Sequence, residues 1–196
     1  MGTIKTTNIE TITGSGTLTL GQSGETITVP SGATINLSNA TQTGVGGTNT
    51  PAFEAYTNGL QSITENTFVK MTMATEVYDT DNCYDNSTNY RFTPTVAGKY
   101  YVYGKAYTDP SSYNNDRSSD MYIYKNGSTV VATQSNIMTG GNSSSEGATA
   151  TTHNCSCVVD MNGTSDYLEL YLRLNTWNDS GAQAGSKQFG AYRILT

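Results

Sequence analysis

The chain has 196 residues and a mass of 20.9 kDa, which suits one domain of ordinary size with a short appendage. Only 13% of the residues are charged, and the ten Lys and Arg are scattered in a chain of net charge −6, so the sequence excludes a basic stripe for nucleic-acid binding. It also lacks an apolar run of about 18 residues, so we expect no membrane span.

The composition is polar but typical of a folded β-protein. Thr, Ser, Asn and Gly dominate, yet there are 14 Tyr, 4 Phe and 1 Trp, and disordered chains are poor in aromatic residues. Thr and Tyr favour strands, so we expect an all-β fold. The residues from Met1 to Lys5 do not begin a secretion signal, which predicts synthesis in a cytoplasm without export by a signal peptide.

Residues 1–48 contain no aromatic residue and carry a short repeat. Gly16, Gly24 and Gly32 lie eight residues apart, and after each one aliphatic residues alternate with Thr or Asn. The predicted strands span 17–20, 26–29 and 34–37. Each strand offers only two aliphatic side chains for burial, so we expect copies of the chain to bury one another, as in a three-sided β-prism shaft. A local meander packed on the rest of the chain is the alternative.

Residues 49–196 predict a second domain, separated from the first by the Gly-rich stretch at 44–48. Turn residues recur about every ten positions, and no amphipathic helix interrupts them, which is typical of an antiparallel sandwich or jelly roll. The predicted strands lie near 52–57, 67–75, 89–93, 99–108, 119–125, 129–134, 148–160, 166–175 and 188–195.

Alternation within these strands predicts the core and a second, tyrosine-bearing surface. Leu168, Leu170, Leu172 and Leu174 share one strand face, which predicts burial. Tyr residues occupy the opposite faces of several strands, and their apolar ring with a polar tip is well suited to interfaces. We therefore expect self-association through Tyr-bearing faces, with partly exposed cross-strand Tyr pairs as the alternative.

Three cysteines, Cys83, Cys155 and Cys157, make an odd number, which argues against a disulfide framework. Cys155 and Cys157 lie two apart in a predicted strand, so their side chains point the same way and are poorly placed to bond each other. We expect free thiols.

Several motifs between residue 53 and the end of the chain resemble a known family. Phe53 and Tyr56 precede Gln61; Tyr84 and Asp85 lead to the segment 91–101, which reads Arg-Phe-Thr-Pro-Thr-Val-Ala-Gly-Lys-Tyr-Tyr; and the chain closes with Phe-Gly-Ala-Tyr-Arg-Ile-Leu at 189–195. This pattern resembles the globular head of the complement q subunit and the tumour-necrosis-factor-like jelly rolls. The resemblance covers about 51–196.

The resemblance implies a jelly roll of about ten antiparallel strands that forms a tight homotrimer on a stalk. This chain has no collagen-like Gly-X-Y run, and its Thr- and Gly-rich repeat instead looks like the shafts of bacteriophage fibres. The residues predicted to form the trimer interface or the core are Phe53, Tyr56, Phe92, Tyr100, Tyr101, Tyr122, Tyr124, Tyr171, Phe189 and Tyr192.

The sequence gives little support for catalysis. His153 is the single histidine, so a two-histidine metal centre is impossible, and neither a Gly-x-Ser-x-Gly elbow nor a phosphate-binding Gly-x-x-x-x-Gly-Lys occurs. Asp79, Asp81 and Asp85 concentrate oxygen donors and form a weak calcium candidate, although Asp is also a common turn residue. We expect no enzyme and no required cofactor.

Predicted loops offer candidate recognition sites. Aromatic rings beside amides and charged groups suit receptor or glycan binding. The candidates are Tyr113, Asn114, Asn115, Arg117, Trp177 and Asn178. The alternatives are a contact of Trp177 at the edge of the core or between subunits, and solvated loops that bind nothing.

Together these features predict a homotrimeric structural protein of a bacteriophage virion, either a fibre tip or a capsid decoration. Residues 1–48 would attach to other virion proteins, and loops of the head would bind a host surface glycan or receptor. A secreted, trimeric tumour-necrosis-factor-like ligand or lectin is the alternative. Fold-level analogy supports the virion interpretation.

Overall fold

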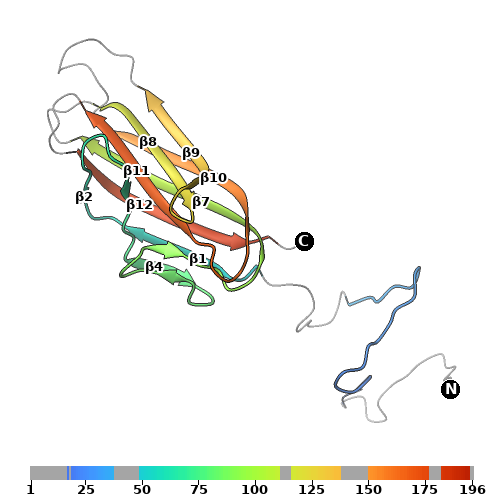
Figure 1. The fold of residues 1–196 in the computed structure, drawn as a ribbon. Helices are drawn as coiled ribbons and strands as arrows, with labels where there is room; N and C mark the ends of the chain where they lie inside the picture. Colours follow the sequence, from blue (N-terminus) through green and yellow to red (C-terminus); the bar gives the residue numbers. More distant parts are fainter. Residues whose placement is uncertain are drawn as a thin grey trace. The chain divides into compact units, whose positions relative to one another are not determined.

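The computed structural model describes residues 17, 19–37, 49–110, 116–137, 150–176 and 182–194, and for residues 109, 110, 116 and 182 it describes the backbone. The chain divides into two compact units, Met1–Val45 and Gly46–Thr196. All the strands of the described residues belong to the second unit (Figure 1). None of the described residues forms a helix with the length and hydrophobicity that a membrane crossing requires.

The strands divide between two antiparallel sheets, as expected for an all-β sandwich. The described strands are β1 (Ala52–Thr57), β2 (Gln61–Ser62), β3 (Val69–Lys70), β4 (Thr75–Asp79), β5 (Tyr84–Asp85), β6 (Arg91–Phe92), β7 (Gly98–Pro110), β8 (Asp116–Lys125), β9 (Thr129–Ile137), β10 (Thr151–Met161), β11 (Leu168–Thr176) and β12 (Ala182–Arg193). The first sheet, sheet A, has the order β10-β7-β12-β1-β4, and β2 also pairs with β12. The second, sheet B, has the order β5-β6-β11-β8-β9, and β3 also pairs with β11.

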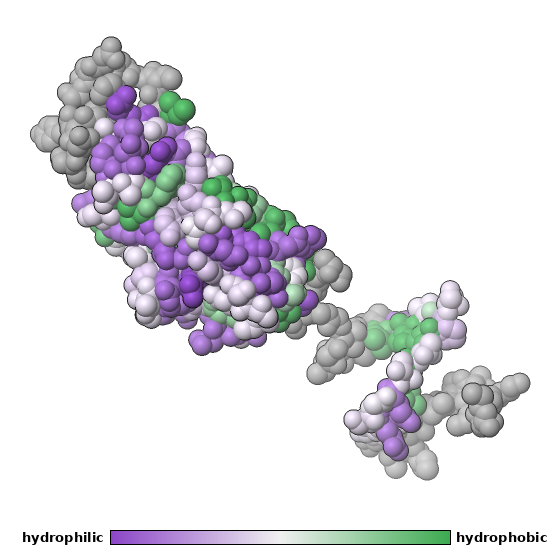
Figure 2. All heavy atoms as spheres, in the orientation of Figure 1, coloured by the Kyte–Doolittle hydropathy of each residue, from purple (hydrophilic) through white to green (hydrophobic). Residues whose placement is uncertain are grey.

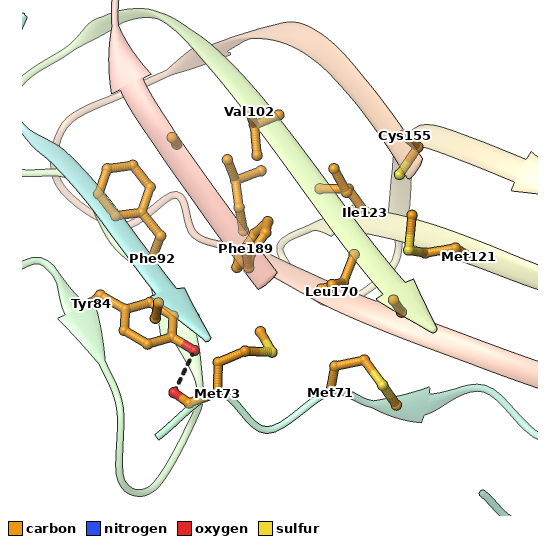
Figure 3. Close-up of a cluster of buried hydrophobic side chains, with 14 of the residues drawn as sticks. Met71, Met73, Tyr84, Phe92, Val102, Met121, Ile123, Cys155, Leu170 and Phe189 are labelled. Carbon is orange, nitrogen blue, oxygen red and sulfur yellow. Dashed lines mark hydrogen bonds between the residues drawn. The ribbon is translucent and has the colours of Figure 1, made fainter. Parts of the chain in front are cut away.

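The core lies between the sheets and follows the alternation in the sequence. Leu168, Leu170, Leu172 and Leu174 are fully buried, which confirms the predicted leucine stripe of β11. Rings from both sheets fill one end of the core: Phe53 stacks on Tyr84 and on Phe92, and Phe189 meets Phe53 edge-on. Figure 3 labels Tyr84, Phe92 and Phe189 in this core and marks the hydrogen bond from the Tyr84 hydroxyl to the Met73 carbonyl, which is 3.2 Å long. The buried aromatic and aliphatic side chains supply the main driving force for folding.

The predicted strand at 67–75 is wrong, because the chain changes sheets within it. Val69 and Lys70 pair with β11 in sheet B, whereas β4 begins at Thr75 and pairs with β1 in sheet A. Between them Met71 and Met73 are fully buried. A crossing segment with alternate buried residues has the same period as a strand, so the sequence pattern could not separate them.

The N-terminal unit also differs from expectation. Its described residues contain turns at 23–24 and 31–32 but none of the predicted strands at 26–29 and 34–37, and at 17–20 the described residues are not in a strand either. The aliphatic side chains of these segments are exposed in the single chain, among them Leu20 at 60%, Ile27 at 61% and Ile35 at 59%. In Figure 2 hydrophobic residues are visible on the surface of this unit. A strand with an unburied apolar face has nothing to stabilise it.

Candidate functional site

The outer face of sheet A carries the largest group of exposed aromatic residues in the described part of the chain. In the register of the sheet, Val158 of β10 lies beside Tyr101 of β7, which lies beside Tyr192 of β12. The rings of Tyr101 and Tyr192 are 5.5 Å apart. We call this surface the tyrosine face, and it comprises Tyr78, Tyr101, Tyr103, Tyr107, Val158 and Tyr192.

Side chains of the tyrosine face remain exposed although they are mainly apolar. Val158 is 55% exposed, Tyr78 41% and Tyr192 37%. Val158 projects from β10, the edge strand of sheet A, and Tyr78 from β4, the opposite edge strand. The apolar exposure therefore extends from one edge of sheet A to the other, as a contact surface requires.

A hydrogen-bond network fixes the middle of this face. The Tyr103 hydroxyl donates to the Glu54 carboxylate at 2.5 Å, and the Gln188 amide donates to the same carboxylate at 2.8 Å. Burial raises the pKa of Tyr103, and the hydrogen bond to Glu54 raises it further, so the phenol stays protonated at neutral pH. The network holds the ring of Tyr103 in one orientation.

Two shallow grooves run side by side on the same surface. One has a volume of about 240 Å³ and is lined by Tyr101, Tyr103 and Ser156, while the other has about 230 Å³ and is lined by Tyr56 and Ser186. Lys105 and Gln188 line both grooves. The exposed Lys105 ammonium has no ion-pair partner among the described residues.

The outer face of sheet B is aromatic too, but its groups satisfy one another within a single chain. Phe68 packs on Tyr122 with ring centroids 4.4 Å apart, and Tyr124 meets Tyr171 edge-on at 5.0 Å. The neighbouring charges are paired: Lys70 contacts Glu169 at 2.5 Å, and Arg173 contacts Asp120 at 2.5 Å. All of these rings are half-buried. The rings and charges of this face therefore satisfy one another, while Val130 and Ile137 of the edge strand β9 remain 45% and 75% exposed.

The structure separates the predicted interface and core residues into three locations. Phe53, Phe92, Tyr100 and Phe189 are fully buried between the sheets. Tyr56, Tyr101 and Tyr192 lie on the outer face of sheet A. Tyr122, Tyr124 and Tyr171 lie on the opposite side of the sandwich, on sheet B. The two groups of tyrosines therefore lie on opposite outer faces of one chain.

Most of the predicted receptor or glycan residues lie outside the described residues; these are Tyr113, Asn114, Asn115, Trp177 and Asn178. Arg117 is described, and it is exposed near the start of β8.

The predicted calcium ligands are used for a different purpose. Asp85 accepts backbone hydrogen bonds from Ser87, Thr88 and Asn89 at 3.1, 2.9 and 3.1 Å. These bonds hold the pKa of Asp85 well below its usual range, because each favours the carboxylate. Asp79 accepts the backbone N–H of Tyr84 at 2.7 Å.

No three His, Cys, Asp or Glu side chains gather into a possible metal site in the ranges that the structure describes. Asp81, the third predicted ligand, accepts a hydrogen bond from the Thr80 hydroxyl at 2.7 Å. The prediction of calcium at Asp79, Asp81 and Asp85 is thus not supported. The acidic residues instead order the loop between β4 and β6, as turn-forming Asp residues commonly do.

A polar pocket that the sequence analysis did not predict adjoins this loop. It has a volume of about 620 Å³ and lies beside the edge strands β4 and β5. Its lining includes Glu76, Asn82, Tyr84, Asp85, Asn86 and Arg91. The polar residues after Tyr84 indicate a loop in the sequence. The pocket itself also needs Glu76 of β4, which belongs to the other sheet, and the sequence does not show that these two segments meet.

The histidine and two of the three cysteines, Cys83 and Cys155, are buried, and Cys157 is half-buried. His153 is fully buried, its Nε2 atom has no hydrogen-bond partner in the described structure, and burial lowers its pKa. The three cysteines are free, as predicted, and burial raises the pKa of Cys155 to about 12. A neutral buried imidazole and a protonated buried thiol are poor candidates for catalytic groups.

Comparison with known protein families finds no family model that matches the chain, and comparison with curated proteins finds no match.

Proposed function

We propose that the protein is a structural, non-enzymatic head that assembles into a homotrimer through its tyrosine face. The exposed apolar surface across sheet A carries this proposal. A second copy is the occupant that fits best, because tyrosine and valine side chains would bury apolar area while the phenol hydroxyls stay hydrogen-bonded. The sheet B face contrasts with it, since its rings and charges are paired within one chain.

The order of the strands supports a jelly roll as the finer description of the sandwich. Sheet A places β12 between β7 and β1, and sheet B places β11 between β6 and β8. In each sheet, a strand from the C-terminal end of the chain thus lies between two strands that come before it in the sequence. Two interleaved Greek keys have this pattern. The threefold symmetry comes from the resemblance to tumour-necrosis-factor-like heads.

The N-terminal unit supports attachment to a larger particle. Val29 and Leu37, like the other described aliphatic residues of this unit, are exposed in the single chain. Such side chains become buried when copies of the segment intertwine or when other virion proteins cover them. Together with the resemblance of the repeat to fibre shafts, this favours a bacteriophage fibre tip or capsid-decoration protein located in the virion.

Charge substitutions on the two faces test the assembly. We expect Val158→Asp to convert the trimer to monomer in sedimentation velocity, because it places a carboxylate in the apolar contact. Val130→Asp is the matched control, since Val130 is also exposed, at 45%, but lies on β9 of sheet B. A trimer that survives Val158→Asp, or one that Val130→Asp dissociates equally, would contradict assembly through the tyrosine face.

A further inference from the structure

We propose that the pocket beside β4 and β5 binds a neutral saccharide unit through hydrogen bonds. Its volume of about 620 Å³ is large enough for a monosaccharide, and like the two grooves on sheet A it is shallow and open to solvent. The lining residues all come from one chain, and Glu76 lies on β4 two residues from Tyr78, at the edge of the tyrosine face. Saccharide binding and trimer formation are therefore measured separately.

The lining offers unused donors and acceptors. The side chains of Glu76, Asn82 and Asn86 make no hydrogen bond within the described part of the chain. Glu76 presents acceptors, the two amides present both donors and acceptors, and the Arg91 guanidinium presents donors. A ligand covered with hydroxyl groups, each both donor and acceptor, complements this mixture.

The walls of the pocket are held in place before a ligand arrives. The Arg91 guanidinium lies over the Tyr167 ring at 4.5 Å from its centroid. On the loop side, the Asp85 carboxylate accepts a hydrogen bond of 2.7 Å from the Asn89 side-chain amide, in addition to its three bonds from backbone N–H groups. The Asp79 carboxylate accepts a hydrogen bond of 2.7 Å from the Tyr84 backbone N–H. Binding therefore costs little ordering of the loop.

The same lining disfavours other ligand classes. Apolar ligands would leave the polar lining unpaired. Anions, including acidic sugars, would meet the carboxylates of Glu76 and Asp85 beside the one cation, Arg91. Cations would find Asp85 already saturated by backbone N–H groups. A neutral pyranose avoids all three conflicts.

Saturation-transfer difference NMR on the full chain tests this proposal, with the methyl glycosides of glucose, galactose, mannose and N-acetylglucosamine as probes. We expect at least one glycoside to give a saturable signal that falls at least fivefold in Glu76→Gln and in Arg91→Ala. Arg91→Lys keeps the charge but loses the planar fork, and we expect it to reduce the signal too.

Lys99→Ala is the control, because Lys99 is an exposed cation that pairs with Asp160 at 2.9 Å and does not line the pocket. Unchanged melting temperatures show that the variants are folded. The proposal is overturned if none of the four glycosides gives a signal, if Glu76→Gln and Arg91→Ala leave the signal unchanged, or if Lys99→Ala abolishes it. Light scattering on the same variants reports the trimer separately.

Discussion

The Tyr103 hydroxyl donates a hydrogen bond to the Glu54 carboxylate across Gly190, which lies between these two residues in the register of β7, β12 and β1. A Cβ atom at Gly190 would overlap the Tyr103 ring, so the contact requires a residue without a side chain at this position. Three neighbouring strands thus cooperate to lay one ring flat on the outer surface of sheet A.

Substitution of Gly190 tests this arrangement. We expect Gly190→Ala to lower the free energy of unfolding by about 1–3 kcal/mol, because the Tyr103 ring must leave its position and its bond to Glu54. Urea denaturation measures the change. Gly59→Ala is the control, since a Cβ there meets only Thr57 Cγ2 at 3.6 Å. Equal stability of Gly190→Ala and the parent protein would show that the ring does not need this glycine.

Asp85 predicts a pH-dependent contribution to stability. Its pKa is lowered in the folded state, so its contribution is complete above the unfolded pKa of about 3.9 and is lost as the pH falls toward the folded value. At pH 7 we expect Asp85→Ala to cost about 1–2 kcal/mol, the usual effect of losing a side-chain cap on backbone N–H groups. Thermal unfolding checks this, with the exposed Asp81→Ala as control. A cost at Asp81 as large as that at Asp85 would refute the assignment.

His153 predicts a loss of stability between pH 7 and 5. Its side chain is buried beside Asn136 and near the Asp120–Arg173 ion pair, and burial lowers its pKa, which Asp120 only partly opposes. The unfolded chain therefore takes up a proton first, so the free energy of unfolding falls as the pH drops through about 6.5, by at most about 1.4 kcal/mol per pH unit. We expect His153→Gln to flatten this slope in chemical denaturation series. A parent protein whose stability is constant from pH 7 to 5 would argue against a buried neutral imidazole.

The sequence pattern predicted the sandwich well wherever a strand keeps one face in the core. The strand at 52–57 and the leucine stripe of β11 are found as predicted. In these strands successive side chains point alternately into the core and toward the outer face of the sheet, so the sequence pattern shows which residues are buried. The prediction failed at 67–75, where the chain crosses between sheets with Met71 and Met73 still buried. The polar pocket could not be predicted either, since it joins Glu76 of sheet A with Arg91 of sheet B.

The N-terminal residues predict a simple deletion result. The core of the sandwich lies entirely within the second unit, and Leu20, Ile27 and Ile35 are exposed in the single chain. We expect a protein lacking residues 1–48 to keep a cooperative unfolding transition, while losing its incorporation into particles. Calorimetry and copurification with particles measure the two effects. An unfolded deletion protein, or one that still copurifies with particles, would contradict the division of roles.

The mass of the full chain in solution tests the central claim most directly. Multi-angle light scattering should give three times 20.9 kDa if the tyrosine faces of three copies meet. A mass of 20.9 kDa, maintained as the concentration rises, would contradict the trimer and would mean that the exposed Val158 and Tyr192 side chains serve another purpose.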